Sequence, residues 1–181
     1  MRSVPSARHC AALQAISATR MSATWAGSVA NNDPAADYPA AMLALNATIH
    51  TNKRKIAADD FFVGMFETAL EDGEIIVSFS FEAPDKAAYQ KFANPASRYA
   101  MAGVFVAKKG ADVRVAVTGA GSNGVFRHQG MEAALKAAWS PDALAAVSVD
   151  AGMMLSDIHG NSEYRANLVK VMAKRAVSAA G

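Results

Sequence analysis

Apolar and polar residues alternate in short stretches of the first half of the chain, which is the pattern of half-buried strands. The clearest stretch is 75–81, where every second residue from Ile75 to Phe81 is apolar and is expected to share one buried face. Shorter strands are expected at 47–51 and around Ile56. Glycine, proline and Asx residues separate these stretches, as expected for turns.

Three longer strands are predicted in the middle of the chain, at 88–92, 99–108 and 113–118. In the last of them every second residue is valine, which predicts one face directed toward a core, with Arg114 and Ala116 pointing away. The connection 109–112 is short and contains a glycine, so the last two strands are expected to form a hairpin.

Helical spacing of apolar residues appears before and after this run of strands. One short helix is expected to begin with Asp37 as its N-cap and to end at Asn46. Helices dominate the last third and are predicted at 131–139, 141–147 and 163–179. Because strands precede helices, we expect an α+β fold in which the helices pack on one face of an antiparallel sheet.

Composition excludes several classes of protein. Of 181 residues, 52% are hydrophobic and the formal net charge is only +2, as in an ordinary globular chain. The basic run at 53–55 is short and has no aromatic neighbours, so it predicts a solvated strand end and no nucleic-acid site. No stretch approaches the ~20 apolar residues of a membrane span. The single cysteine, Cys10, cannot form a disulfide or an iron–sulfur cluster by itself.

The glycine-rich segment 119–124 matches the pattern G-x-G-x-x-G and follows a predicted strand. A dinucleotide site needs a helix that begins within this motif, so that its amides can hold a pyrophosphate. Here a strand-like stretch and Gly130 follow instead. We therefore expect a turn between strands, with an NAD(P)-binding module at Gly119–Gly124 as the less favoured alternative.

A second segment of small residues runs from Thr24 through Ala26, Gly27 and Ser28. Small side chains let backbone N–H groups approach a phosphate, and hydroxyl groups can supplement them. Composition alone also fits a tight loop without a ligand.

This segment resembles the second flavin-binding motif of the FAD subunits and domains of molybdenum hydroxylases, such as the carbon-monoxide dehydrogenase medium chain. The family pattern T/S-[IV]-G-G-[SND]-[ILV]-A, followed by P-[AI]-[AS]-D, is matched without a gap at Thr24, Gly27, Ser28 and Asp37. The resemblance implies that the loop cradles the pyrophosphate of FAD and that the aspartate bonds the flavin. Asn31 occupies a position whose side chain also reaches the cofactor in the family.

The resemblance continues toward the C-terminus. Further segments similar to family motifs are D-D-F-F-V-G at 59–64, E-I-I at 74–76, A-Y-Q-K-F at 88–92, S-R-Y-A at 97–100 and S-E-Y-R at 162–165. By analogy, Ile76, Lys91 and Tyr99 lie beside the isoalloxazine ring. The alternatives are a core contact for Ile76, a solvated strand residue for Lys91 and a buried aromatic for Tyr99.

The resemblance also predicts how the chain is divided. Residues 1–22 are expected to be the remnant of a truncated N-terminal segment, 23–82 a second FAD-binding subdomain, and 83–181 a small C-terminal domain. The family's first flavin motif, A-G-G-x-S-L, has no counterpart in this sequence. Ala26 also stands where the family has glycine, which would disfavour a positive φ if the site required one.

The function implied by the resemblance is that of an oxidoreductase subunit active only in a complex. FAD on this chain would pass electrons from [2Fe–2S] clusters to an external acceptor. The clusters would lie on a small subunit and the molybdenum cofactor on a large one, in a dimer of heterotrimers. The expected location is the cytoplasm, with the inner face of the membrane as an alternative. A remnant that docks without holding FAD is the alternative function, and the substrate is a property of the large subunit.

Overall fold

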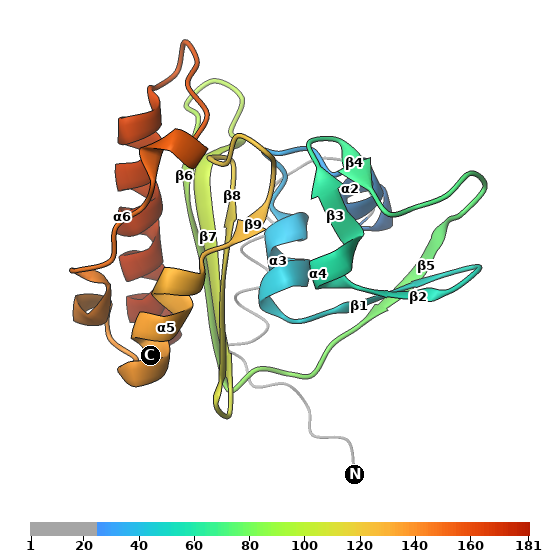
Figure 1. The fold of residues 1–181 in the computed structure, drawn as a ribbon, viewed down its shortest axis with the longest axis horizontal. Coiled ribbons are helices and arrows are strands. Elements are labelled where there is room, and N and C mark those ends of the chain that lie inside the picture. Colours follow the sequence, from blue (N-terminus) through green and yellow to red (C-terminus); the bar gives the residue numbers. More distant parts are fainter. Residues whose placement is uncertain (1–24) are drawn as a thin grey trace.

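A four-stranded antiparallel sheet stands at the centre of the computed structural model, which describes residues 25–181 (Figure 1). Its strands are β6 (Lys86–Ala93), β7 (Ala100–Lys109), β8 (Asp112–Thr118) and β9 (Phe126–Arg127), paired in that order. The predicted hairpin joins β7 to β8, with Lys109 opposite Asp112. The α+β prediction is confirmed.

The C-terminal helices cover one face of this sheet. They are α5 (Gln129–Ala137), the 3-10 helices η1 (Pro141–Leu144) and η2 (Ala151–Met153), and α6 (Ser162–Ala180). The predicted Ser140 cap is present, because its hydroxyl accepts a hydrogen bond from the Ala143 amide at 3.2 Å. The helix expected at 141–147 is, however, only the short η1, which ends at Leu144.

Both faces of the central sheet are buried, each in a core of its own. Val113, Val115 and Val117 point into the core beneath the C-terminal helices, as predicted. Ala116, expected to point away from a core, is fully buried in a second core formed with the N-terminal half. The sheet is therefore the middle layer of three, as Figure 1 shows.

The N-terminal half supplies that third layer. Its elements are α2 (Trp25–Asn31), α3 (Tyr38–Ala44), β1 (Thr48–Thr51), β2 (Lys55–Ala57), α4 (Ala58–Phe61), β3 (Phe62–Gly64), β4 (Glu67–Thr68) and β5 (Ile76–Ser80). Helix α3 is almost wholly buried and packs on β7 and β8. Asn46, at φ 50°, follows it in the left-handed region, in agreement with the predicted helix end.

Two predictions about this half are wrong. The small residues after Thr24 form helix α2 and not a loop, since Val29 is fully buried and fastens the helix to the second core. Ile75, just before β5, and Val77 within it are 63% and 66% exposed, although they were expected on a buried face. The pairing of β1 with β5 shifts register between His50 and Thr51, and such a bulge moves the buried side from one alternate set of residues to the other.

The remnant predicted at 1–22 lies outside the described residues. Within residues 25–181, no helix is long and apolar enough to cross a membrane.

Candidate functional site

A cavity of about 360 Å³ lies between α2, the loop that follows it and the facing ends of β6 and β7. Its lining includes six of the residues predicted to bind the cofactor: Gly27, Ser28, Asn31, Asp37, Lys91 and Tyr99. Its volume is within the range of about 300–1,000 Å³ that is usual for ligand pockets. The structure therefore brings together residues that are up to 72 positions apart in sequence (Gly27 to Tyr99).

The first turn of α2 supplies one wall. Ala26, Gly27 and Ser28 all lie in this turn, and Gly27 and Ser28 line the cavity. Neither Ala26 nor Gly27 has a positive φ. The alanine at the family's glycine position is thus compatible with the local backbone. Thr24, the predicted start of the motif, lies outside the described residues.

Asn32 fixes the C-terminal end of α2. It is buried at φ 45°, and its side-chain amide donates to the carbonyl oxygens of Gly64 at 2.7 Å and Glu67 at 3.0 Å. The amide of Phe66 donates in return to the Asn32 carbonyl at 3.1 Å. These bonds hold α2 against the β3–β4 hairpin, so that Asn31, the last residue of α2, is kept at the pocket.

The loop after α2 is held by the central sheet. Asp33 forms a turn by accepting the Ala35 amide at 2.9 Å. The amide of Gly119 donates to the carbonyl of Pro34 at 2.8 Å, and the hydroxyl of Thr118 lies 2.6 Å from the carbonyl oxygen of Ala36. The end of strand β8 therefore holds in place the loop that lines the pocket.

Asp37 stands at the N-cap position of α3 but does not cap it. Its backbone is helical, at φ −81° and ψ −36°, and its side chain makes no capping bond. The carboxylate is only 6% exposed; it accepts a hydrogen bond from the hydroxyl of Tyr89 and pairs with Lys91 Nζ at 2.7 Å. The capping prediction is wrong for this side chain, because β6 offers it two stronger partners.

Lys91 and Tyr89 are both less exposed to solvent than residues of a solvated strand would be. The side chain of Lys91 is 19% exposed. Burial, followed by the negative charge of Asp37, raises the pKa of Tyr89 well above its ordinary value, so this phenol is a neutral donor. Sequence reasoning missed Tyr89, although it lies two residues before Lys91 and therefore on the same face of a strand.

Aromatic rings border the pocket at two further places. Tyr99, just before β7, is half-buried and lines the cavity. Tyr38, the first residue of α3, also lines it and packs on Trp25 with ring centroids 5.0 Å apart. Burial is the main cause that raises the pKa of Tyr38. A flat, partly apolar ligand could pack against such rings.

Ile76 does not line this cavity, because it lies on β5 and packs against the second core. A separate cavity of about 560 Å³, near the β7–β8 hairpin and lined in part by Lys108 and Arg114, contains none of the predicted site residues. The motif residues thus distinguish the smaller cavity as the candidate site.

The glycine-rich segment 119–124 is a turn between strands, as predicted. It leads into β9 and not into a helix. Gly119 has φ 80°, and a side chain there would collide with the Ala100 carbonyl. A side chain at Gly121 would lie 2.8 Å from the Phe126 ring. Close packing explains both glycines without a nucleotide.

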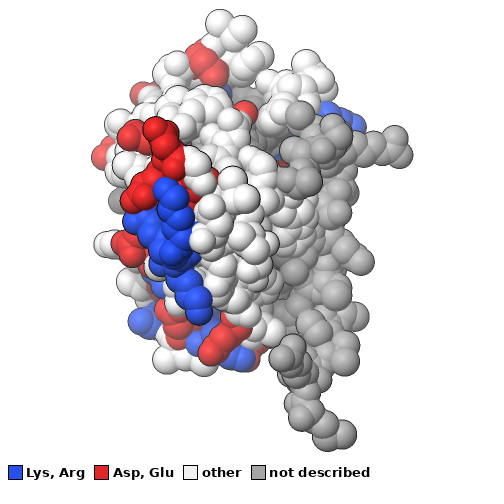
Figure 2. Space-filling view, turned by 90° about the vertical axis from the view of Figure 1, so that its right-hand side faces the viewer, with Lys and Arg blue, Asp and Glu red and all other residues white. Residues whose placement is uncertain are grey.

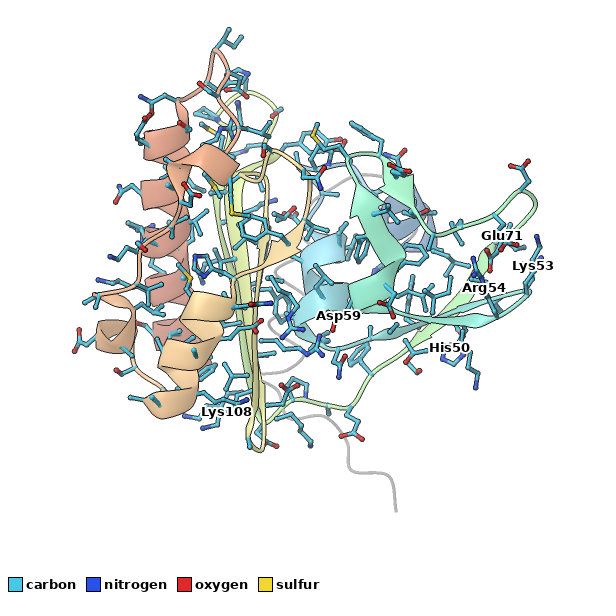
Figure 3. The ribbon with its side chains drawn as sticks, in the orientation of Figure 1. His50, Lys53, Arg54, Asp59, Glu71 and Lys108 are labelled. Carbon is cyan, nitrogen blue, oxygen red and sulfur yellow. The ribbon has the colours of Figure 1, made fainter. Side chains whose placement is uncertain are left out.

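The basic run at 53–55 is balanced by acidic neighbours. Lys53 and Arg54 lie with Glu71 at the far end of the β1–β2–β5 sheet (Figure 3). Lys53 Nζ is 3.5 Å from Glu71, and Arg54 Nε is 3.1 Å from the carboxylate of Glu74. Figure 2 shows basic and acidic side chains side by side on this face. A surface of mixed charge does not favour a phosphate backbone.

The site as a whole has the features of a nucleotide-cofactor pocket: small residues at a helix start, an enclosed lysine and bordering aromatic rings. Comparison with known families agrees. A family described as the FAD binding domain in molybdopterin dehydrogenase matches residues 1–83, and the CO dehydrogenase flavoprotein C-terminal domain matches residues 87–180. The chain belongs to the flavoprotein family of molybdenum hydroxylases typified by carbon-monoxide dehydrogenase.

Individual relatives point the same way. The chain is 36% identical to the nicotine 6-hydroxylase medium subunit of Paenarthrobacter nicotinovorans over 87% of its own length. It is 29% identical to the carbon monoxide dehydrogenase medium chain of Hydrogenophaga pseudoflava, again over 87%. The solved CO dehydrogenase of Oligotropha carboxidovorans superposes with a TM-score of 0.74 at 28% identity, covering 87% of this chain. The chain spans about 60% of the length of each of these proteins.

Proposed function

We propose that this chain binds FAD in the pocket of α2, β6 and β7 and serves as the electron-transfer part of a molybdenum hydroxylase medium subunit. The observation that carries the proposal is the convergence of six motif residues on one cavity, together with the part-buried Asp37–Lys91 pair. When bound, FAD can accept electrons one at a time and release a pair, chemistry that no side chain supplies.

The residues present fit such a group. Gly27 and Ser28 line the cavity at the start of α2, where small side chains would let the backbone approach a pyrophosphate, and Thr24 and Ala26 belong to the same proposed segment. Asn31 faces the same cavity. Asp37, Lys91 and Tyr99 gather at one side of it, where they could bond and cover a flavin ring; the role of Ile76 beside that ring stays a prediction.

The partners are proposed from the family. Relatives carry the names medium subunit and medium chain, as in nicotine 6-hydroxylase and carbon monoxide dehydrogenase. We accordingly propose that a small subunit supplies [2Fe–2S] clusters and a large subunit the molybdenum cofactor, in a cytoplasmic dimer of heterotrimers. This chain would relay electrons from the clusters to an external acceptor, with residues 23–82 and 83–181 as its two functional parts.

Titration of the purified protein with FAD tests the proposal. Bound flavin absorbs near about 450 nm and its fluorescence is quenched on binding. Replacing Lys91 by Met is expected to weaken binding about tenfold or more, because a charge-assisted contact is lost. The matched control is Lys86→Met, on the same strand but near the C-terminus, where the Lys86 ammonium bonds the carbonyl of Gly181.

Two results would contradict the proposal. A protein that binds NAD(P) but no flavin would favour the glycine segment 119–124 as the site. A colourless protein that still co-purifies with large and small subunits would favour a docking remnant.

A further inference from the structure

The hydroxyl of Tyr89 contacts the carboxylate of Asp37 in the interior of the molecule. The side chain belongs to β6 and is 4% exposed. Its hydroxyl donates to Oδ1 of Asp37, while Lys91 on the same strand pairs with Oδ2 at 2.7 Å. The two carboxylate oxygens are therefore held by alternate residues of one strand, whose side chains share a face.

Gly103 on β7 leaves the space that this phenol needs. It pairs with Lys91 on one side and with Thr118 on the other, so the three residues form a row across the sheet. Tyr89 pairs with Phe105, two residues further along β7, and so reaches diagonally over the glycine. A Cβ at position 103 would collide with the Tyr89 hydroxyl and lie 2.9 Å from Thr118 Cγ2.

Thr118, which belongs to the same row across the sheet, also holds the main chain next to Asp37. The hydroxyl of Thr118 is 2.6 Å from the carbonyl oxygen of Ala36. Asp37 is thus held at its backbone by β8 and at its carboxylate by β6, and not by the helix that it precedes. Such a doubly held carboxylate has little freedom to rotate, which preorganises it for a ligand in the adjacent pocket.

We propose that Tyr89 is a positioning residue for the cofactor: with the gap at Gly103, it orients the Asp37 carboxylate toward the pocket and offsets part of its negative charge. The inference rests on the proposed function, because it assumes that this pocket holds FAD. Two properties should depend on it. Orientation affects the affinity for FAD, and the offset charge affects how readily the flavin accepts electrons, because nearby charge tunes a cofactor's electronics.

Tyr89→Phe keeps the ring and removes only the donor. We expect the dissociation constant for FAD, measured by fluorescence titration, to rise about tenfold or more, as for loss of a hydrogen bond to a charged group. We also expect the midpoint potential of the bound flavin, measured by spectroelectrochemistry, to become more negative. The carboxylate is then less neutralised and repels added electrons more strongly.

Phe105→Leu is the matched control. Its ring centroid is 6.1 Å from that of Tyr89 in the same core, so the change disturbs packing and leaves the hydroxyl in place. It is expected to lower stability without shifting the flavin potential. A shift as large as that of Tyr89→Phe would show that packing and not the hydroxyl matters, and would overturn the inference.

A double-mutant cycle tests the Gly103 contact without any flavin. Gly103→Ala should destabilise the protein more strongly beside Tyr89 than beside phenylalanine, as measured by urea unfolding, because the added methyl meets the hydroxyl. Strictly additive effects would refute the role of Gly103. If the unchanged protein fails to bind FAD, the proposed function falls together with the inference. If it binds FAD and Tyr89→Phe changes neither affinity nor potential, only the inference falls.

Discussion

The hydroxyl of Thr118 lies 2.6 Å from the carbonyl oxygen of Ala36, which joins β8 to the loop that lines the candidate flavin pocket. The same hydroxyl is 3.0 Å from the carbonyl of Pro34, which also accepts the Gly119 amide at 2.8 Å. The loop and the strand are matched by different families, the FAD binding domain and the C-terminal domain. The pocket is therefore shaped jointly by both parts of the chain.

Thr118→Val tests this contact between β8 and the pocket loop. Valine has nearly the same shape but no hydroxyl, and Thr118 is fully buried, so the loop carbonyls lose a donor that water cannot replace. We expect the free energy of unfolding to fall by about 1–2 kcal/mol and FAD binding to weaken. Urea unfolding and flavin titration measure the two effects. Thr48→Val, on β1, is the control; an unchanged FAD affinity with reduced stability would contradict the link between Thr118 and the pocket.

Asp59, labelled in Figure 3, connects the two halves at a second point and does not line the pocket. Its carboxylate is 2.9 Å from Arg114 of β8 and 3.0 Å from Arg127 of β9. Because Asp59 is partly exposed, we expect Asp59→Ala to cost only about 1 kcal/mol, and less at high salt. The adjacent Asp60→Ala, on the same short helix, should change little. Equal effects in urea unfolding at low salt would show that the bridge contributes nothing.

Local patterns predicted the C-terminal part of the fold well. The alternating valines of 113–118 and the cap at Ser140 depend on neighbours close in sequence, and the structure confirms both. The prediction failed where distant contacts decide. Helix α2 is rich in small residues and forms because Val29 is buried and Asn32 bonds the β3–β4 hairpin. The bulge that reverses the faces of β5 has no sequence signal comparable to a glycine or proline.

The candidate site divides in the same way. Motif resemblance gathered Gly27, Asp37 and Lys91, which the structure places around one cavity. It did not identify Tyr89 or Thr118. Tyr89 contacts Asp37 and Thr118 contacts the carbonyl of Ala36, and only the folded sheet creates these contacts. The one available signal was the spacing in A-Y-Q-K-F, which puts the tyrosine and lysine on the same face of a strand.

Glu74 gives the stability a pH dependence that is independent of the pocket. Hydrogen bonds from Arg54, then from Thr51 and the Glu71 amide, lower its pKa to about 2. A carboxylate whose pKa is depressed by folding stabilises the folded state above its unfolded pKa, and this contribution is lost as the pH falls toward about 2. Glu74→Gln should therefore flatten the decline of stability between about pH 4.5 and 2. Urea unfolding at several pH values checks this, with Glu82→Gln as the control; parallel pH profiles for Glu74→Gln and the unchanged protein would contradict it.

Arg165 holds together the end of the sheet nearest the pocket. Its guanidinium is buried and donates to the carbonyls of Met101 at 2.8 Å and Gly119 at 2.9 Å, and to Asp157 at 2.6 Å. A lysine cannot reproduce this fork of donors, so Arg165→Lys is expected to lower the free energy of unfolding by about 2–3 kcal/mol. Arg175→Lys, on the exposed side of the same helix, should be neutral in urea unfolding. Gly119 also donates to the carbonyl of Pro34 in the pocket loop, so Arg165→Lys should weaken FAD binding as well. A loss of stability with unchanged FAD affinity would show that the disturbance does not reach the pocket.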